Sequence, residues 1–193
     1  TGLGRAQKLH HLWQAPFSLH PNIIKAIERE TANAQAGKPA RIMAKMNSLL
    51  EPKVIDALYV ASQAGVKIDL LVRGACALRP GVAGLSENIR VRSIIGRFLE
   101  HHRIFCFHNE GEDNVYLSSA DWMERNFFRR IELCFPILDP RLKKRVLAEG
   151  LRVYLRDNHQ AWELLADGRY EPRRGRGEPI CAQYDLMKLL GDR

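Results

Sequence analysis

The sequence predicts an α/β fold in which helices cover a largely parallel sheet. Over the first 72 residues, segments with strand-like alternation of apolar residues take turns with amphipathic helical segments. The length of 193 residues suits one domain with a sizeable core. Hydrophobic residues make up 46% of the chain, close to the globular average, which excludes a disordered or collagen-like chain.

The first half of the chain is expected to form three strands and two helices. Ile23, Ile24 and Ile27 recur at helical spacing, and Pro52 precedes a second apolar stripe. Glycines follow both segments, where helices commonly stop. We therefore expect strands at 12–13, 41–46 and 66–72, and helices running from Pro21 to Gly37 and from Pro52 to Gly65.

The second half is expected to contain further strands and to end in a helical extension. Asp139-Pro140 stops one apolar strand and starts a long helix that runs to about Leu155. An arginine-rich loop over 169–176 separates that helix from the last one. We expect strands at 89–95, 103–107, 115–118 and 131–138, a short helix at 121–126 and a final helix at 179–190.

Charge and cysteine content narrow the class of protein. Lys and Arg exceed Asp and Glu by 30 to 22, and this excess of +8 favours a polyanionic partner. No apolar run approaches the roughly 18 residues of a membrane span. The four cysteines lack zinc-ligand spacing, and two lie in apolar strands, so we expect buried, reduced thiols inside the cell.

The stretch 98–107 holds the most informative pattern. His101 and Arg103, two apart at a strand, share one face, and His102 points the other way. The cation can neutralise an anionic oxygen, and the imidazole can attack it or protonate a leaving group. Glu132 starts an apolar strand, where a carboxylate needs a partner, either an imidazole or, alternatively, an arginine in a structural ion pair.

A second candidate site follows the strand at 66–72. Arg73 stands at the carboxyl end of this strand, where open α/β sheets bind ligands, and arginine grips phosphate in a bidentate way. Lys45 and Asn47 end the preceding strand and are expected at the same edge. A surface salt bridge is the alternative for Arg73. Neither a Gly-x-Gly-x-x-Gly nor a Walker-type loop is present.

Several long segments together resemble the C-terminal domain of bacterial polyphosphate kinases, within the phospholipase D-like fold group. Their order and spacing are more specific than any single short motif. The segments are 15–21, 45–49, 71–76, 86–90, 97–101, 116–123 and 138–142. The resemblance implies a mixed sheet flanked by helices, with a C-terminal helical extension. It covers nearly the whole chain.

The same resemblance implies an enzyme that reversibly moves the γ-phosphate of ATP onto inorganic polyphosphate through a phosphohistidine. His101 resembles the assisting histidine, Arg73 the arginine at the nucleotide phosphate, and Glu132 the carboxylate that supports the histidine. Lys45 and Arg103 would offset phosphate charge. The fold group's usual signature is His-x-Lys-x4-Asp, and here Arg103 and His108 replace the Lys and the Asp, which suits an assisting role.

The phosphorylated histidine and the Mg²⁺ ligands are expected in a preceding domain, and no metal ligands in this chain. Residues 1–11 would be a linker or the tail of that domain, and 12–193 the domain itself. The expected partners are ATP or ADP, inorganic polyphosphate, the preceding domain and further copies of the chain, without specific nucleic-acid binding. A cytoplasmic location is expected, with peripheral association at the inner membrane face as an alternative. The isolated chain is expected to be inactive.

Two other functions stay open at this stage. One is a phospholipase D-like phosphodiesterase or nuclease that completes its site by homodimerisation. The other is a non-catalytic polyanion-binding module that relies on the net charge of +8. In that module the arginines of 169–176 would contact phosphates without sequence readout, unless they are a solvated cluster.

Overall fold

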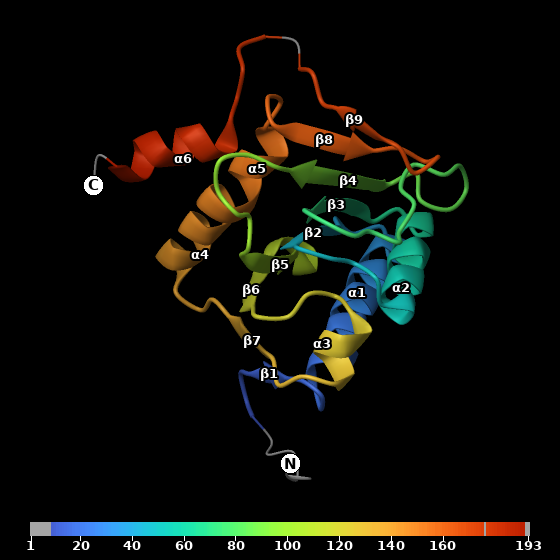
Figure 1. Cartoon of the computed structure of the whole chain (residues 1–193). Helices are drawn as coiled ribbons and strands as arrows, with labels where there is room; N and C mark the ends of the chain where they lie inside the picture. The colour runs from blue at the N-terminus through green and yellow to red at the C-terminus, as the bar shows by residue number, and fades with distance from the viewer. Residues whose placement is uncertain (1–8, 176, 192–193) are drawn as a thin grey trace.

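The computed structural model describes residues 9–175 and 177–191 (Figure 1). The linker expected at 1–11 therefore lies largely outside the described residues. The strands form one sheet in the order β1-β7-β6-β5-β2-β3-β4-β8-β9. Their bounds are β1 Trp13–Gln14, β2 Arg41–Met46, β3 Lys67–Val72, β4 Ile89–Ile94, β5 Arg103–Phe107, β6 Asn114–Ser118, β7 Leu133–Pro136, β8 Ala161–Leu164 and β9 Tyr170–Pro172.

The sheet is mixed. Only the central neighbours β2–β3 and β3–β4 run parallel, and every other pair of neighbours is antiparallel. The expectation of a largely parallel sheet is wrong, because the strand–helix alternation that predicted it ends after β3. The mixed sheet implied by the family resemblance is confirmed.

Helices cover both faces of this sheet (Figure 1). One hydrophobic core lies beneath α1, α2 and α3, and a second beneath α4, the π-helical segment η2, α5 and α6. The bounds are α1 Leu19–Gln35, α2 Pro52–Gln63, α3 Glu124–Phe128, α4 Pro140–Leu147, η2 Ala148–Arg152, α5 Val153–Arg156 and α6 Ala182–Gly191, and a 3-10 turn η1 spans Asn109–Gly111. The expected long helix is thus present as the continuous run from α4 to α5.

Local sequence signals explain where two helices begin. Pro52 and Pro140 occupy the first turns of α2 and α4, where a missing N–H costs nothing. The carboxylate of Glu51 accepts the N–H of Val54 at 2.7 Å, and that of Asp139 accepts the N–H of Arg141 at 2.8 Å. These side chains satisfy N–H groups that the helix itself leaves without partners.

Strand β2 is buried on both faces and separates the two cores. Ile42, Ala44 and Met46 belong to the core beneath α1 and α2, and Met43 belongs to the opposite core. Because side chains alternate along a strand, Lys45 points to the same side as Met43, toward α5. A charged residue is thereby placed in the second core, beneath α5.

The hairpin β8–β9 departs from the expected loop at 169–176. Tyr170–Pro172 pairs with β8 as an exposed edge strand, a position that tolerates proline and charge. Arg169 pairs with Asp167, and Arg173 donates to the carbonyl of Asp157 at 2.6 Å. These two arginines are therefore engaged within the chain, and Arg176 lies outside the described residues.

All four cysteines are free, as expected. Cys106, Cys134 and Cys181 are buried, and Cys76 is half-buried. Burial raises the pKa of the Cys106 and Cys134 thiols to about 12. Among the described residues, no helix has the length and apolar character needed to span a membrane.

Candidate active site

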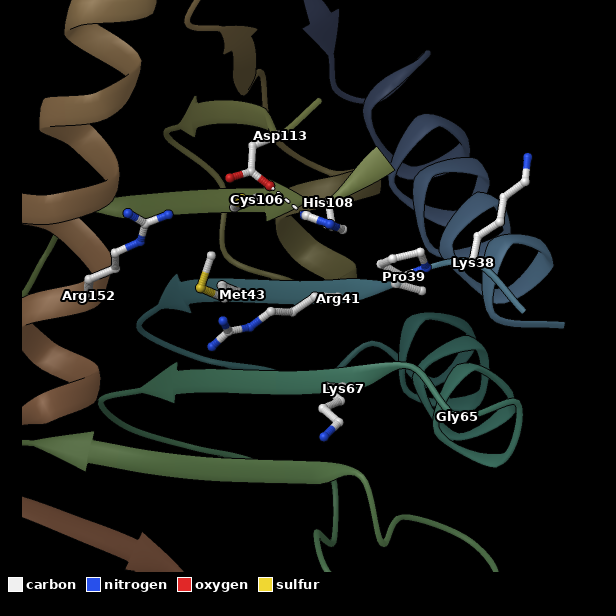
Figure 2. A pocket seen from close by; sticks show the side chains of 11 residues that line it. Lys38, Pro39, Arg41, Met43, Gly65, Lys67, Cys106, His108, Asp113 and Arg152 are labelled. Atoms are coloured by element: carbon white, nitrogen blue, oxygen red, sulfur yellow. Dashed lines mark hydrogen bonds and ion pairs between the residues drawn. The ribbon is translucent and has the colours of Figure 1, made fainter. Parts of the chain in front are cut away.

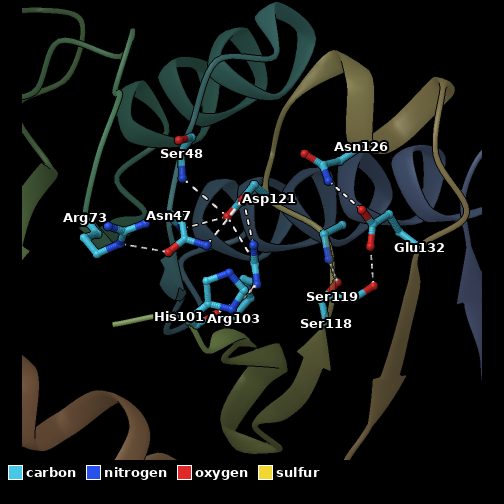
Figure 3. Close-up of polar contacts among 11 residues, drawn as sticks. Asn47, Ser48, Arg73, His101, Arg103, Ser118, Ser119, Asp121, Asn126 and Glu132 are labelled. Carbon is cyan, nitrogen blue, oxygen red and sulfur yellow. Dashed lines mark hydrogen bonds and ion pairs between the residues drawn. The ribbon is translucent and has the colours of Figure 1, made fainter. Parts of the chain in front are cut away.

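The strand directions bring four separate segments to one edge of the sheet. The parallel strands β2 and β3 end there, with Met46 opposite Val72. The antiparallel strand β5 begins at the same edge, and Arg103 at its start lies opposite Ser118, the last residue of β6. The residues just beyond these strand ends, shown in Figure 3, form one polar cluster.

Asp121 and Arg103 are the centre of this cluster. Nε and Nη2 of Arg103 donate to the two carboxylate oxygens of Asp121 at 3.2 and 2.9 Å. The backbone N–H groups of Asn47 and Ser48 also donate to Asp121, at 2.7 and 3.4 Å. Burial opposes ionisation of this carboxyl, but these donors outweigh it and lower the pKa of Asp121.

Arg103 also fixes the state of His101. Its Nη1 lies 3.1 Å from Nδ1 of His101 and donates to the His101 carbonyl at 2.9 Å. A guanidinium can only donate, so Nδ1 must accept, and the neutral ring carries its proton on Nε2. Asp121 therefore acts on His101 through Arg103. The ring itself is exposed at the surface.

Arg73 joins the same network from the end of β3. Its Nε donates to Oδ1 of Asn47 at 3.0 Å, and Asn47 in turn bonds to Asp121. In the part of the chain that is described, neither Nη group of Arg73 has a hydrogen-bond partner. Arg73 is half-buried, so two donor groups of a held guanidinium remain available to an anion. The salt-bridge alternative for Arg73 is not found among the described residues.

Lys45 lies beside Arg73 but below the surface. Both line one small hollow together with Glu100. The ammonium donates to Glu100 at 2.7 Å, lies 4.6 Å from the centre of the Tyr154 ring, and its side chain is 4% exposed. Burial lowers the pKa of Lys45 despite the Glu100 charge, and the Arg73 charge adds to this lowering. The expected phosphate contact of Lys45 stays a prediction, and the ion pair is what the structure shows.

Arg103, like Lys45, is already paired with a carboxylate of the chain. Its side chain is 11% exposed and its charge is paired with Asp121. Although we expected Arg103 to offset phosphate charge, its geometry favours orienting His101 instead. Arg73, by contrast, keeps both Nη groups without a hydrogen-bond partner among the described residues.

Glu132 is held by Ser119 and Asn126, apart from the Asp121–Arg103 pair. It accepts Oγ of Ser119 at 2.5 Å and Nδ2 of Asn126 at 2.6 Å, and it is 9% exposed. Within the described residues it pairs with neither His101 nor an arginine, so the arginine pair considered from the sequence is not formed. Its role as support for a histidine stays a prediction.

The other histidines lie elsewhere. His102 points away from His101, as predicted, and packs 5.3 Å from the Tyr154 ring, with Nε2 3.3 Å from the carbonyl of Gly150. Burial, reinforced by the Lys45 charge, lowers the pKa of His102 to about 4. His108 pairs with Asp113 in a hollow of about 470 Å³ at the start of β2 (Figure 2).

The described residues offer no ligand set for Mg²⁺. No group of three or more His, Cys, Asp or Glu side chains is gathered anywhere in 9–175 or 177–191. That the Mg²⁺ ligands belong to a preceding domain stays a prediction of the resemblance.

The structure adds Glu100, a residue that the sequence did not single out as functional. Glu100 accepts a hydrogen bond from Lys45 and so fixes it. It carries a weak signal, since it is a lone carboxylate between an apolar residue and the histidine pair. Asn47, which was expected at this edge, lies there and links Arg73 to Asp121, a contact that the sequence pattern did not predict.

Comparison with solved structures first shows the class of fold. A phospholipase D family member, Nuc from Salmonella typhimurium, matches with a TM-score of 0.52 and 16% identity over 71% of this chain and 88% of that chain. At this identity the likeness shows the fold alone. The chain has a phospholipase D-like fold.

Sequence comparison then identifies the family. The family model "Polyphosphate kinase C-terminal domain 2" matches residues 12–183, so the chain belongs to this family. Polyphosphate kinases from Burkholderia multivorans and Burkholderia cenocepacia are 66% and 67% identical over 187 residues, which is 97% of this chain but 27% of theirs. The crystal structure of polyphosphate kinase from Porphyromonas gingivalis matches with a TM-score of 0.93 and 39% identity, over 98% of this chain and 29% of that one.

Proposed function

We propose that the chain supplies one half of the catalytic site of an ATP:polyphosphate phosphotransferase. In this reaction a histidine from the preceding domain attacks the γ-phosphorus of ATP. A nitrogen–phosphorus bond forms, the bond to the bridging oxygen breaks, and ADP leaves with the electron pair. The terminal oxygen of a polyphosphate chain then takes the phosphoryl group from that histidine, and the reverse sequence makes ATP.

The observation that carries this proposal is the hydrogen bond from Arg103 to Nδ1 of His101 at 3.1 Å. It occupies Nδ1 and leaves a proton on Nε2, so neither nitrogen is presented as a nucleophile. The exposed Nε2–H can instead donate to the departing oxygen as negative charge develops there. His101 therefore suits the assisting role better than the role of the phosphorylated residue.

Arg73 suits the phosphate contact. Asn47 holds its Nε, and its two Nη groups are left for nonbridging phosphate oxygens. Phosphoryl transfer depends mainly on positioning and charge stabilisation, and a prefixed guanidinium supplies both. Lys45, 2.7 Å from Glu100 beneath the same edge, contributes positive potential rather than a direct ligand.

Glu132 is proposed as the carboxylate that supports the catalytic histidine. Ser119 and Asn126 fix its two oxygens, so its carboxylate has a set orientation at this end of the sheet. ATP, ADP, polyphosphate, Mg²⁺, the preceding domain and a cytoplasmic location are parts of the same proposal, as is oligomer formation. The family match over 12–183 supports ATP and polyphosphate as substrates.

The test compares His101→Ala and Arg73→Ala in a full-length polyphosphate kinase that carries this sequence. We expect His101→Ala to abolish ATP-dependent polyphosphate synthesis while ATP still binds, and Arg73→Ala to weaken ATP binding. Glu132→Gln should lower turnover without weakening ATP binding. A His101→Ala enzyme with unchanged turnover would contradict the proposal and favour a passive polyanion-binding module.

The hydrolase alternative is not favoured. The relatives that are 66% and 67% identical are named polyphosphate kinase, and Nuc is 16% identical. The Lys and Asp of the fold group's histidine signature are replaced here by Arg103 and His108. Hydrolysis of a generic phosphodiester by the purified chain would revive this alternative.

A further inference from the structure

The loop that carries His101 has little hydrophobic packing to hold it. Residues 95–102, named here the histidine loop, connect β4 to β5. The apolar side chains of Ile95, Phe98 and Leu99 are all exposed, and Glu100 is the one buried residue of this loop. The position of the loop therefore depends on its polar contacts.

Gln183, near the start of α6, makes three of these contacts. Its Oε1 accepts the N–H of Phe98 at 3.0 Å, and its Nε2 donates to the Phe98 carbonyl at 2.8 Å. The same Nε2 donates to Oε1 of Glu100 at 2.7 Å. Gln183 is 4% exposed, so these bonds are shielded from water.

Two anchors make this arrangement rigid. Glu100 uses its other oxygen to accept Lys45 of the central strand β2. The N-terminal end of α6 is fixed because the fully buried Asp157 accepts the N–H of Ala182 at 2.8 Å. The residue directly before His101 is thus tied both to the sheet and to the C-terminal helix.

Gly96 allows the loop to approach Gln183 this closely. A Cβ atom at Gly96 would lie 2.5 Å from Oε1 of Gln183, and 2.4 Å from Oε1 of Gln160. Among the described residues the buried Oε1 of Gln160 has no hydrogen-bond partner, so Gln160 can move at little cost. Gln183 would lose its bonds to Phe98 and Glu100 if it moved.

We infer that Gln183 is a positioning residue for His101, acting through Phe98 and Glu100. This inference rests on the proposed function, in which Nε2 of His101 meets the departing phosphate oxygen. A shift of about 1 Å in a catalytic group can cost roughly a hundredfold in rate. The C-terminal helix therefore contributes to catalysis although it bears no residue that touches the substrate.

The test measures kcat, KM for ATP and the thermal midpoint in a full-length polyphosphate kinase that carries this sequence. Gln183→Ala removes the contacts. Gly96→Ala displaces the side-chain amide of Gln183 while residue 183 itself stays a glutamine. Both should lower kcat by roughly 10- to 100-fold with little change in KM for ATP, because Arg73 is unaffected. Tyr184→Ala is the matched control, since Tyr184 is the exposed next residue of α6, and it should behave as wild type.

Gln183→Glu keeps the shape of the side chain and changes its hydrogen-bonding groups and charge. It places a second carboxyl group where the Gln183 amide lies 2.7 Å from Glu100, and the repulsion should lower kcat at least as much as Gln183→Ala. A lowered thermal midpoint with wild-type kcat in all three variants would show a purely structural role and overturn the inference.

His101→Ala, measured in parallel, separates the two proposals. If it abolishes turnover while the Gln183 and Gly96 variants keep wild-type kcat, only the positioning role is wrong. If His101→Ala keeps turnover, the proposed function fails, and the inference that rests on it fails as well.

Discussion

Arg103 donates from Nη1 to Nδ1 of His101 across 3.1 Å while its other two nitrogens bind Asp121. The carboxylate fixes the guanidinium, and the guanidinium fixes the imidazole. Since Arg103 has no acceptor, the arrangement selects one tautomer of His101.

Arg103→Lys should impair catalysis although it conserves charge. A lysine offers one ammonium and cannot bind both oxygens of Asp121 while it also donates to Nδ1 of His101. We expect kcat to fall roughly 10- to 100-fold with little change in KM for ATP, measured by polyphosphate synthesis in the full-length enzyme. Arg129→Lys is the control, because Arg129 makes only an exposed pair with Glu124. Equal losses in the two variants would argue against a specific role of Arg103.

Asp121→Asn should destabilise the chain. It leaves the Arg103 guanidinium, with an 11% exposed side chain, without a compensating charge, and we expect a loss of about 3 kcal/mol in the free energy of unfolding at pH 7. The lowered pKa of Asp121 means that its contribution is present above its ordinary pKa of 3.8 and is lost as the pH falls through the lower native value.

Urea unfolding of the purified chain at several pH values measures this effect. The difference between wild type and Asp121→Asn should be full at pH 7 and should shrink in acid below pH 3.8. Asp167→Asn, which removes an exposed partner of Arg169, should change stability little. A difference that does not vary with pH would contradict the assignment to ionised Asp121.

Lys45→Met should also destabilise the chain, because it leaves Glu100 buried without its cation. We expect a loss of about 3 kcal/mol in the free energy of unfolding, measured with urea at pH 7. Adding Glu100→Gln removes the unpaired charge and keeps an oxygen for Gln183, so the double variant should recover much of the loss. A double variant no more stable than Lys45→Met would exclude a charge effect.

His102 should make stability depend on pH between about 4 and 6.5. Its pKa is lowered to about 4, so the unfolded chain takes up a proton below pH 6.5 and the native chain only near pH 4. Stability should therefore decrease as the pH falls through this window. Glu100, Lys45 and the Gly150 carbonyl are the groups around its ring.

His102→Gln should lose less stability than wild type between pH 7 and pH 4.5 in urea unfolding. His159→Gln replaces an exposed histidine and is the matched control, which should follow wild type. If His102→Gln retained the full acid dependence, another group would be responsible for it.

Part of this site could be predicted from the sequence. Arg73 at the end of a buried strand and the His101–Arg103 spacing both indicated a phosphate site at a sheet edge, and the structure brings these segments together. The local sequence pattern could not predict that β5 runs antiparallel to β2. Parallel and antiparallel neighbours can show the same alternation of apolar and polar residues. The edge hairpin β8–β9 was missed since its strands are only four and three residues long.

The sequence by itself determined most of the helices and the central strands, the family and the chemical character of the site. Helix ends at Pro52, Gly65 and Pro140 follow from local backbone preferences, and buried strands follow from apolar periodicity. Only the tertiary structure decided which charges are neutralised. Arg103 and Lys45 look like free cations in the sequence. In the structure each is buried in an ion pair, with Asp121 and with Glu100, because a buried charge needs a partner. Among the described residues, Arg73 is held through its Nε alone, so its two Nη groups stay available, as the proposed phosphate contact requires.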